Sequence, residues 1–179
     1  MLSRRTFLGK VLTVAGGGLG MGLGLSACPL PKATPDLNRI VVGLTPKEIY
    51  SLFERTREPY HDEKSGFFLV PYDTSGRAGR RYVEAGVAAA GLIALRDRCT
   101  GERCRVRFCV PSQWFECPCH GEKYNRAGEY KLGPTERGLD RLKMTVRNDQ
   151  VTVFVKEVVP GPDRSVNTTG QEKEGPFCV

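Results

Sequence analysis

The sequence predicts an all-β fold, built as an antiparallel β-sandwich. The clearest sign is a hairpin, because apolar residues alternate with polar ones over residues 142–146 and again over residues 151–155, on either side of Asn148-Asp149. The other predicted strands are short, and 21 glycines and 12 prolines place turns between them at close intervals. Only one short segment has the pattern of a helix, so the strands are expected to form the core.

The elements follow from local signals. A β-rich run covers residues 39–44, and Thr45-Pro46-Lys47-Glu48 is a capping box with proline at the first helical position, which predicts a helix to about Arg55. The elements expected after the helix are a strand over residues 66–70 ended by Pro71, a glycine- and arginine-rich loop over 74–81, a strand over 92–95, and short strands over 105–108 and 114–115. Glycines at 128, 133 and 138 then mark a turn-rich stretch.

Length and charge suit one domain with an export segment. The 179 residues are 40% hydrophobic, enough for one modest core. The net charge is +7, of which Arg4, Arg5 and Lys10 contribute three, and the remaining basic residues are scattered among acidic ones. Because no basic stripe is interleaved with aromatic residues, nucleic-acid binding has no support.

The first 38 residues are typical of an exported, membrane-tethered protein. Residues 3–8 carry a twin-arginine pattern, and the apolar run over 11–25 is shorter than the roughly 20 residues that span a bilayer. Leu25-Ser26-Ala27-Cys28 has the form of a lipoprotein cleavage box, in which Cys28 would carry lipid; the alternative is an ordinary cleavage site beside a chance cysteine. We therefore expect a signal or anchor over 1–27 and a proline-rich tether over 28–38.

Two short cysteine boxes carry the chemistry. The first is Cys99-Thr-Gly-Glu-Arg-Cys104 and the second is Cys117-Pro-Cys119-His120-Gly121. They place four thiols and an imidazole on two loops, and such soft ligands converging from two loops suit iron or zinc.

This pattern resembles the Rieske iron–sulfur family over about residues 90–156. The family's boxes read Cys-Thr-His-Leu-Gly-Cys and Cys-Pro-Cys-His-Gly. The resemblance implies a Rieske-like domain over 39–160 with a small cluster-binding subdomain in loops 97–136, followed by a polar tail over 161–179. It also implies a [2Fe-2S] cluster on one pair of residues from each box, of which this chain supplies Cys99, Cys117 and His120. The cysteines left in the boxes, Cys104 and Cys119, match the family's disulfide.

Gly101 stands where the family has its other ligand histidine. The fourth ligand is therefore open, with Glu102 and Cys104 as the nearest candidates. Less direct candidates are His61, which is distant in sequence and better explained as a solvated loop residue, and Cys109. Two alternatives to an iron–sulfur cluster also stand: a cluster-free domain that keeps the boxes as a disulfide-tied scaffold, and zinc at Cys99, Cys117 and His120.

Two further positions bear on the redox potential. Tyr124 matches the family's tyrosine that donates to a cysteine sulfur, whereas Glu122 replaces a serine that donates to a bridging sulfide. Losing a donor and gaining a carboxylate both disfavour the reduced cluster, which predicts a potential below that of the family's high-potential members. Cys109 and Cys178 lie outside the family pattern, and either pair with each other or stay free.

The resemblance implies an exported, membrane-tethered electron-transfer subunit of a respiratory or photosynthetic complex of the quinol–cytochrome type, not a stand-alone enzyme. It would work at the periplasmic or outer face of the cytoplasmic membrane, with quinol and a cytochrome-type acceptor as partners and Cys28 in the lipid. His120 would face the quinol. The alternative function is a cluster-free accessory lipoprotein that helps hold a membrane complex together.

Overall fold

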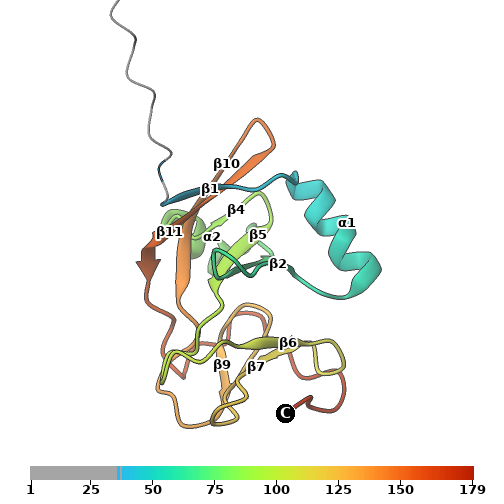
Figure 1. Cartoon of the computed structure of the whole chain (residues 1–179), viewed down its shortest axis with the longest axis vertical. Coiled ribbons are helices and arrows are strands. Elements are labelled where there is room, and N and C mark those ends of the chain that lie inside the picture. The colour runs from blue at the N-terminus through green and yellow to red at the C-terminus, as the bar shows by residue number, and fades with distance from the viewer. Residues whose placement is uncertain (1–35, 37) are drawn as a thin grey trace, which may run out of the picture. The chain divides into compact units, whose positions relative to one another are not determined.

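The computed structural model describes residue 36 and residues 38–179 (Figure 1). The predicted signal over 1–27, Cys28 and nearly all of the tether over 28–38 lie outside the described residues. In the described part of the chain, no helix has the length and apolar character needed to cross a membrane.

A large antiparallel sheet forms the upper part of Figure 1. It contains seven strands, in the order β1-β11-β10-β5-β3-β2 with β4 paired to β5. The strands are β1 (Arg39–Val41), β2 (Tyr60–Asp62), β3 (Phe67–Pro71), β4 (Ala88–Ala89), β5 (Leu92–Arg96), β10 (Arg141–Arg147) and β11 (Gln150–Val159). The predicted hairpin is β10 and β11, and its turn residues Asn148 and Asp149 both adopt positive φ, as a two-residue hairpin turn requires.

A small antiparallel sheet lies below the large one in Figure 1. Its four strands follow the chain order, namely β6 (Arg107–Cys109), β7 (Trp114–Glu116), β8 (Lys123–Tyr124) and β9 (Tyr130–Leu132). Every strand pair in both sheets is antiparallel, and strands far outnumber helices in this part of the chain. The predicted all-β class is confirmed.

One helix was predicted, and residues 38–179 contain two. The capping box at Thr45 starts α1 (Pro46–Thr56) as expected, and the left-handed Arg57 ends it. The prediction of a loop over residues 74–81 is wrong, because the helix α2 (Arg77–Glu84) forms there. The helix is short and rich in arginine, and a tertiary contact stabilises it: Tyr82 is buried, with the Arg141 guanidinium 4.4 Å from its ring centre.

Two hydrophobic clusters form the interior. One joins α1 to the large sheet, around Ile49, Leu69 and Val153. The other joins the two sheets, where the Phe68 and Phe115 ring centres lie 4.9 Å apart, and it also contains Cys99 and Cys117. These two cysteines therefore belong to the core between the sheets.

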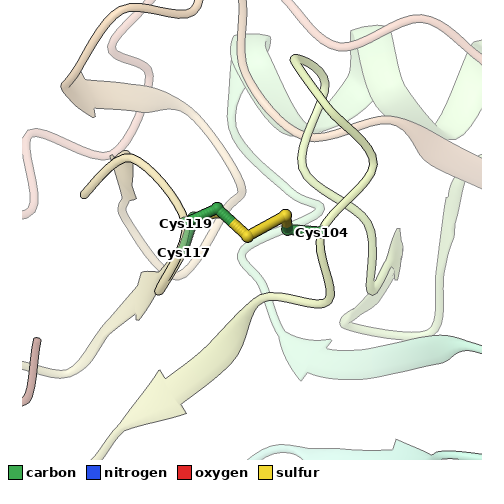
Figure 2. Close-up of side chains that lie close together, drawn as sticks. All are labelled: Cys104, Cys117 and Cys119. Carbon is green, nitrogen blue, oxygen red and sulfur yellow. A yellow bond between two sulfur atoms is a disulfide. The ribbon is translucent and has the colours of Figure 1, made fainter.

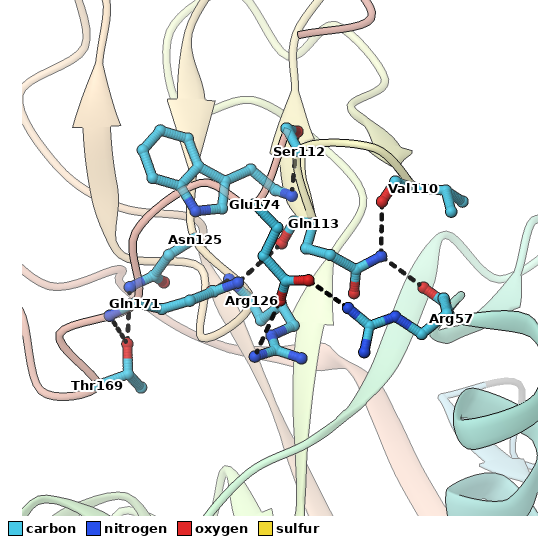
Figure 3. A network of polar contacts seen from close by, with 10 residues as sticks. Arg57, Val110, Ser112, Gln113, Asn125, Arg126, Thr169, Gln171 and Glu174 are labelled. Atoms are coloured by element: carbon cyan, nitrogen blue, oxygen red, sulfur yellow. Dashed lines mark hydrogen bonds and ion pairs between the residues drawn. The ribbon is translucent and has the colours of Figure 1, made fainter. Parts of the chain in front are cut away.

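Residues after β11 return across the small sheet, as Figure 3 shows. The Glu174 carboxylate pairs with Arg57 at the end of α1 and with Arg126 in the β8–β9 loop. The Gln171 side chain donates to the Gln113 carbonyl oxygen, and the Asn125 amide donates to Thr169. The tail thus links α1 to the small sheet.

The start of this tail depends on a close backbone approach. A Cβ added to Gly161 would lie 2.0 Å from the Gly138 carbonyl oxygen and 2.6 Å from that of Leu139. We expect Gly161→Ala to lower the free energy of unfolding by about 3 kcal/mol, measured by denaturant titration, because only backbone movement relieves the clash. Gly43→Ala is the matched control, since its Cβ would have no neighbour within 4 Å. A loss at Gly161 as small as that at Gly43 would contradict this account.

Candidate metal centre

The first cysteine box lies on the loop between β5 and β6. A bridge between Arg98 and Arg105 closes the loop at its base, and the Cys99 amide donates to the Cys104 carbonyl oxygen at 2.8 Å. Asp97, which is fully buried, anchors the same base through ion pairs with Arg98 and Arg105. The loop therefore holds Cys99 and Cys104 side by side.

The second box forms a tight loop between β7 and β8. The Cys117 amide donates to the Glu122 carbonyl oxygen at 2.9 Å, and the Gly121 amide donates to the Cys117 carbonyl oxygen at 3.1 Å. Gly121 has a φ of 73°, a conformation that glycine adopts without strain. This turn directs Cys117 into the core and leaves Cys119 and His120 exposed.

A disulfide joins the two loops between Cys104 and Cys119, with the Cα atoms 6.5 Å apart (Figure 2). It is the pair that the resemblance implied. Because both sulfurs are bonded to each other, Cys104 is not available as the fourth ligand, and that alternative is wrong for the disulfide-bonded protein.

Cys99 and Cys117 are free thiols, 2% and 0% exposed. With Glu122 they form a group whose ligand atoms all lie within 4.8 Å of one another. Burial, helped by the neighbouring Glu122 carboxylate and Cys99, raises the pKa of the Cys117 thiol to about 11. A bound metal cation would take the place of the proton, since the thiolate is the ligand form.

His120 lies at the exposed side of this group. Its side chain is 44% exposed, Nδ1 lies 3.9 Å from Glu122 Oε1, and Nε2 lies 3.8 Å from Glu102 Oε2. The imidazole therefore lies beside the Glu122 carboxylate and is also accessible to a partner or a small molecule.

The Tyr124 hydroxyl approaches the group from the core. It lies 3.2 Å from Cys99 Sγ and 3.3 Å from Thr135 Oγ1. Burial, together with the Cys99 contact, raises the pKa of Tyr124 well above its ordinary value. The hydroxyl keeps its proton, so it can donate to a cysteine thiolate.

The other proposed ligands lie elsewhere or face solvent. His61 stacks on Phe68 and its Nε2 lies 3.2 Å from Asp97 Oδ2, at the base of the first loop. Cys109 forms a disulfide with Cys178, which answers the pairing question left by the sequence. Glu102 is 72% exposed on its side chain. The sequence singled out Glu122 for tuning only, although its position directly after the Cys-His-Gly run was a signal for a closer role.

The donor set fits an iron–sulfur centre. Two buried thiols and a buried carboxylate lie together, and the His120 imidazole lies beside the carboxylate. Glu122 Oε2 has no hydrogen-bond partner among the described residues. Gly101, at the position of the family's missing histidine, lies directly against these groups, since a Cβ there would be 3.3 Å from the Thr135 methyl group and 3.5 Å from Glu122 Oε1. Thiolates and imidazole are the ligands that iron–sulfur centres use.

Residues 77–159 match the family model of the Rieske [2Fe-2S] domain. This segment is a Rieske domain. A Rieske domain implies a [2Fe-2S] cluster, and the cysteine groups that could hold one are present.

Relatives with a Rieske role match over shorter segments. The cytochrome b6-f complex iron-sulfur subunit of Synechococcus elongatus is 38% identical over 68 residues, which cover 38% of this chain and 36% of that protein. Iron-sulfur subunit 2 of the same kind of complex from Nostoc sp. strain PCC 7120 is 32% identical over 61 residues, 34% of each chain. The chain thus spans only about a third of the length of these relatives.

Two solved Rieske structures resemble the chain at lower identity. The cyanobacterial plasma membrane Rieske protein from Synechocystis PCC 6803 aligns with a TM-score of 0.42 and 22% identity, over 64% of this chain and 97% of its own. The soluble domain of Rieske protein II from Sulfolobus acidocaldarius aligns with a TM-score of 0.43 and 14% identity, over 76% and 84% of the two chains.

Proposed function

We propose that this Rieske domain belongs to a one-electron carrier, which works as a subunit of a membrane oxidoreductase complex of the quinol–cytochrome type. The observation that carries the proposal is the pair of buried free thiols, Cys99 and Cys117, on two loops tied by a disulfide, with His120 at the exposed edge. Cys99, Cys117 and His120 would hold a [2Fe-2S] cluster, which supplies reversible uptake of one electron.

The position of His120 favours contact with a redox partner. Its imidazole is the most exposed of the three proposed ligands, so a quinol hydroxyl or an acceptor protein could reach it from solvent. The named relatives are subunits of cytochrome b6-f complexes, which supports a membrane complex and a cytochrome-type acceptor as partners here.

Export and tethering form part of the same proposal. The twin-arginine pattern over residues 3–8, the box ending at Cys28 and the tether over 28–38 indicate a domain held at the outer face of the cytoplasmic membrane. Two disulfides in the domain suit an oxidising compartment. Cys28→Ala is expected to move the protein from the membrane fraction to the soluble fraction, measured by fractionation of cells that express the full chain.

The proposal is tested by iron and acid-labile sulfide analysis of protein purified without oxygen from its native membrane. We expect about two irons and two sulfides per chain, with visible absorption and an electron paramagnetic resonance signal after reduction. A colourless sample without iron would contradict the proposal. It would instead support the second candidate, a cluster-free accessory lipoprotein, which the glycine at position 101 favours.

The Tyr124 hydroxyl provides a finer test of the centre. We expect Tyr124→Phe to lower the midpoint potential by about 40 mV, because one hydrogen bond worth about 1 kcal/mol to a cysteine sulfur stabilises the reduced, more negative state. The shift is measured by redox titration followed by electron paramagnetic resonance. Tyr130→Phe is a matched control, since that hydroxyl donates to the Gly133 carbonyl oxygen instead. Equal shifts in the two variants would count against a direct bond to the centre.

A further inference from the structure

We propose that Glu122 supplies the protein ligand that the first cysteine box lacks, so that the centre is held by two thiolates, one imidazole and one carboxylate. The inference rests on the proposed function, since it requires that a cluster is bound. It differs from the family pattern, in which the fourth ligand is the histidine at the position of Gly101.

The burial of Glu122 is the first observation. The residue is 1% exposed, and Oε2 has no hydrogen-bond partner among the described residues. The one ion-pair contact that Glu122 makes in this part of the chain is with His120, at 3.9 Å. A buried carboxylate oxygen without a partner is costly, and a bound cation is the usual compensation.

The position of the carboxylate is the second observation. Its oxygen lies within 4.8 Å of both Cys99 Sγ and Cys117 Sγ, and Oε1 lies 3.9 Å from His120 Nδ1. The carboxylate is therefore close to each of the three other proposed ligands. Glu102, the other acidic candidate, is 72% exposed on its side chain.

The third observation is that the Glu122 carboxylate lies beside the backbone position that carries the ligand histidine in the family. A Cβ added to Gly101 would be 3.5 Å from Glu122 Oε1 and 3.9 Å from Cys99 Sγ. The chain thus lacks a side chain at 101 and has a longer one at 122 than the family's serine. Glycine in place of histidine at 101 removes side-chain volume and one possible ligand from the site. Glutamate in place of serine at 122 adds side-chain volume and one possible ligand.

The β9 end of the small sheet fixes the Glu122 side chain in this place. Gly133 has a φ of 105°, and a Cβ there would lie 2.7 Å from Glu122 Cα and 2.9 Å from its Cγ. The absence of a side chain at 133 lets the backbone pack directly on Glu122. A ligand whose side chain packs directly on backbone has few other positions, which preorganises it for metal binding.

The test compares iron content, sulfide content and the electron paramagnetic resonance spectrum of four proteins reconstituted as full chains: wild type, Glu122→Gln, Glu122→Ala and Glu102→Gln. We expect both Glu122 variants to bind the cluster at least about tenfold more weakly, as loss of a ligand requires, and Glu102→Gln to match wild type. Glu102 is the control because it is the neighbouring carboxylate without a buried position.

A stability measurement separates ligation from packing. In the metal-free protein, Glu122→Gln is expected to raise the melting temperature by roughly 3 °C, because a neutral amide of the same shape costs less to bury than a carboxyl group whose Oε2 has no hydrogen-bond partner among the described residues. If Glu122 is a ligand, Glu122→Gln should therefore lower the iron content of the loaded protein and raise the melting temperature of the metal-free protein. If Glu122 served packing alone, Glu122→Gln would leave iron content unchanged.

The outcomes distinguish this inference from the proposed function. Wild type that binds the cluster, together with Glu122 variants that keep the same iron content and spectrum, would overturn the inference and leave the proposed function standing. Wild type that takes up no iron would overturn both. If Glu122→Ala does not fold, Glu122→Gln and Glu122→Asp are compared with wild type in its place, since both variants keep most of the side-chain volume.

Discussion

Replacing Gly101 with histidine and Glu122 with serine in the same chain is expected to raise the midpoint potential of the centre into the range of histidine-ligated Rieske clusters, about −150 to +300 mV. The reason is charge, because a neutral imidazole then replaces a carboxylate and a serine hydroxyl becomes available as a donor. Both changes favour the reduced state. Redox titration measures the shift, and electron–nuclear double resonance should detect a second histidine nitrogen at the reduced centre.

The single variant Gly101→His is the control for this prediction. Its new side chain would enter a space whose nearest occupants are the Thr135 methyl group, the Glu122 carboxylate and the Cys99 sulfur. With Glu122 still in place, the imidazole has to displace a buried side chain, so we expect less iron and no second nitrogen coupling. A single variant that performs as well as the double one would show that the two positions are independent.

Removing the disulfide with Cys104→Ser/Cys119→Ser is expected to cost about 3 kcal/mol of stability in the metal-free protein and most of the cluster in the loaded one. The stability loss follows from loop closure over the 15 residues that separate the two cysteines. The cluster loss follows because this covalent bond holds together the loops that carry Cys99 and His120. Denaturant unfolding and visible absorption measure the two effects.

The second disulfide is the matched control. Cys109 and Cys178 are 69 residues apart, so Cys109→Ser/Cys178→Ser should cost about 4 kcal/mol by the same argument. It joins the tail to β6 and does not touch the loops that hold the thiols, so the visible spectrum of the loaded protein should be unchanged. Loss of the spectrum in both double variants would show that global stability, not loop geometry, holds the centre together.

Sequence patterns predicted the elements whose signals are local. The capping box at Thr45 and the alternation that gives β10 and β11 each lie within one short continuous segment, and both are confirmed. In contrast, α2 depends on Arg141, some sixty positions away, and the two-residue strands β4 and β8 are too short to show a period. Contacts between distant segments leave no periodic trace in a single sequence.

In the candidate site too, features with a recognisable local pattern were predicted and features that depend on distant segments were not. The family resemblance implied the Cys104–Cys119 bond from matching positions, whereas the Cys109–Cys178 bond spans too many residues for any spacing rule. Glu122 was recognised as a departure, but its burial beside both thiols depends on the packing of Gly133, which belongs to a different loop.

The burial of Cys99 and Cys117 beneath the disulfide also bears on biogenesis. The two thiols are at most 2% exposed. Once the Cys104–Cys119 bond has formed, neither an assembly scaffold nor a free iron atom can reach them from solvent. We therefore expect a cluster to be inserted before the Cys104–Cys119 bond forms, with the oxidation of this pair as the last step. This order would fit the proposed export, in which the folded chain passes from a reducing into an oxidising compartment.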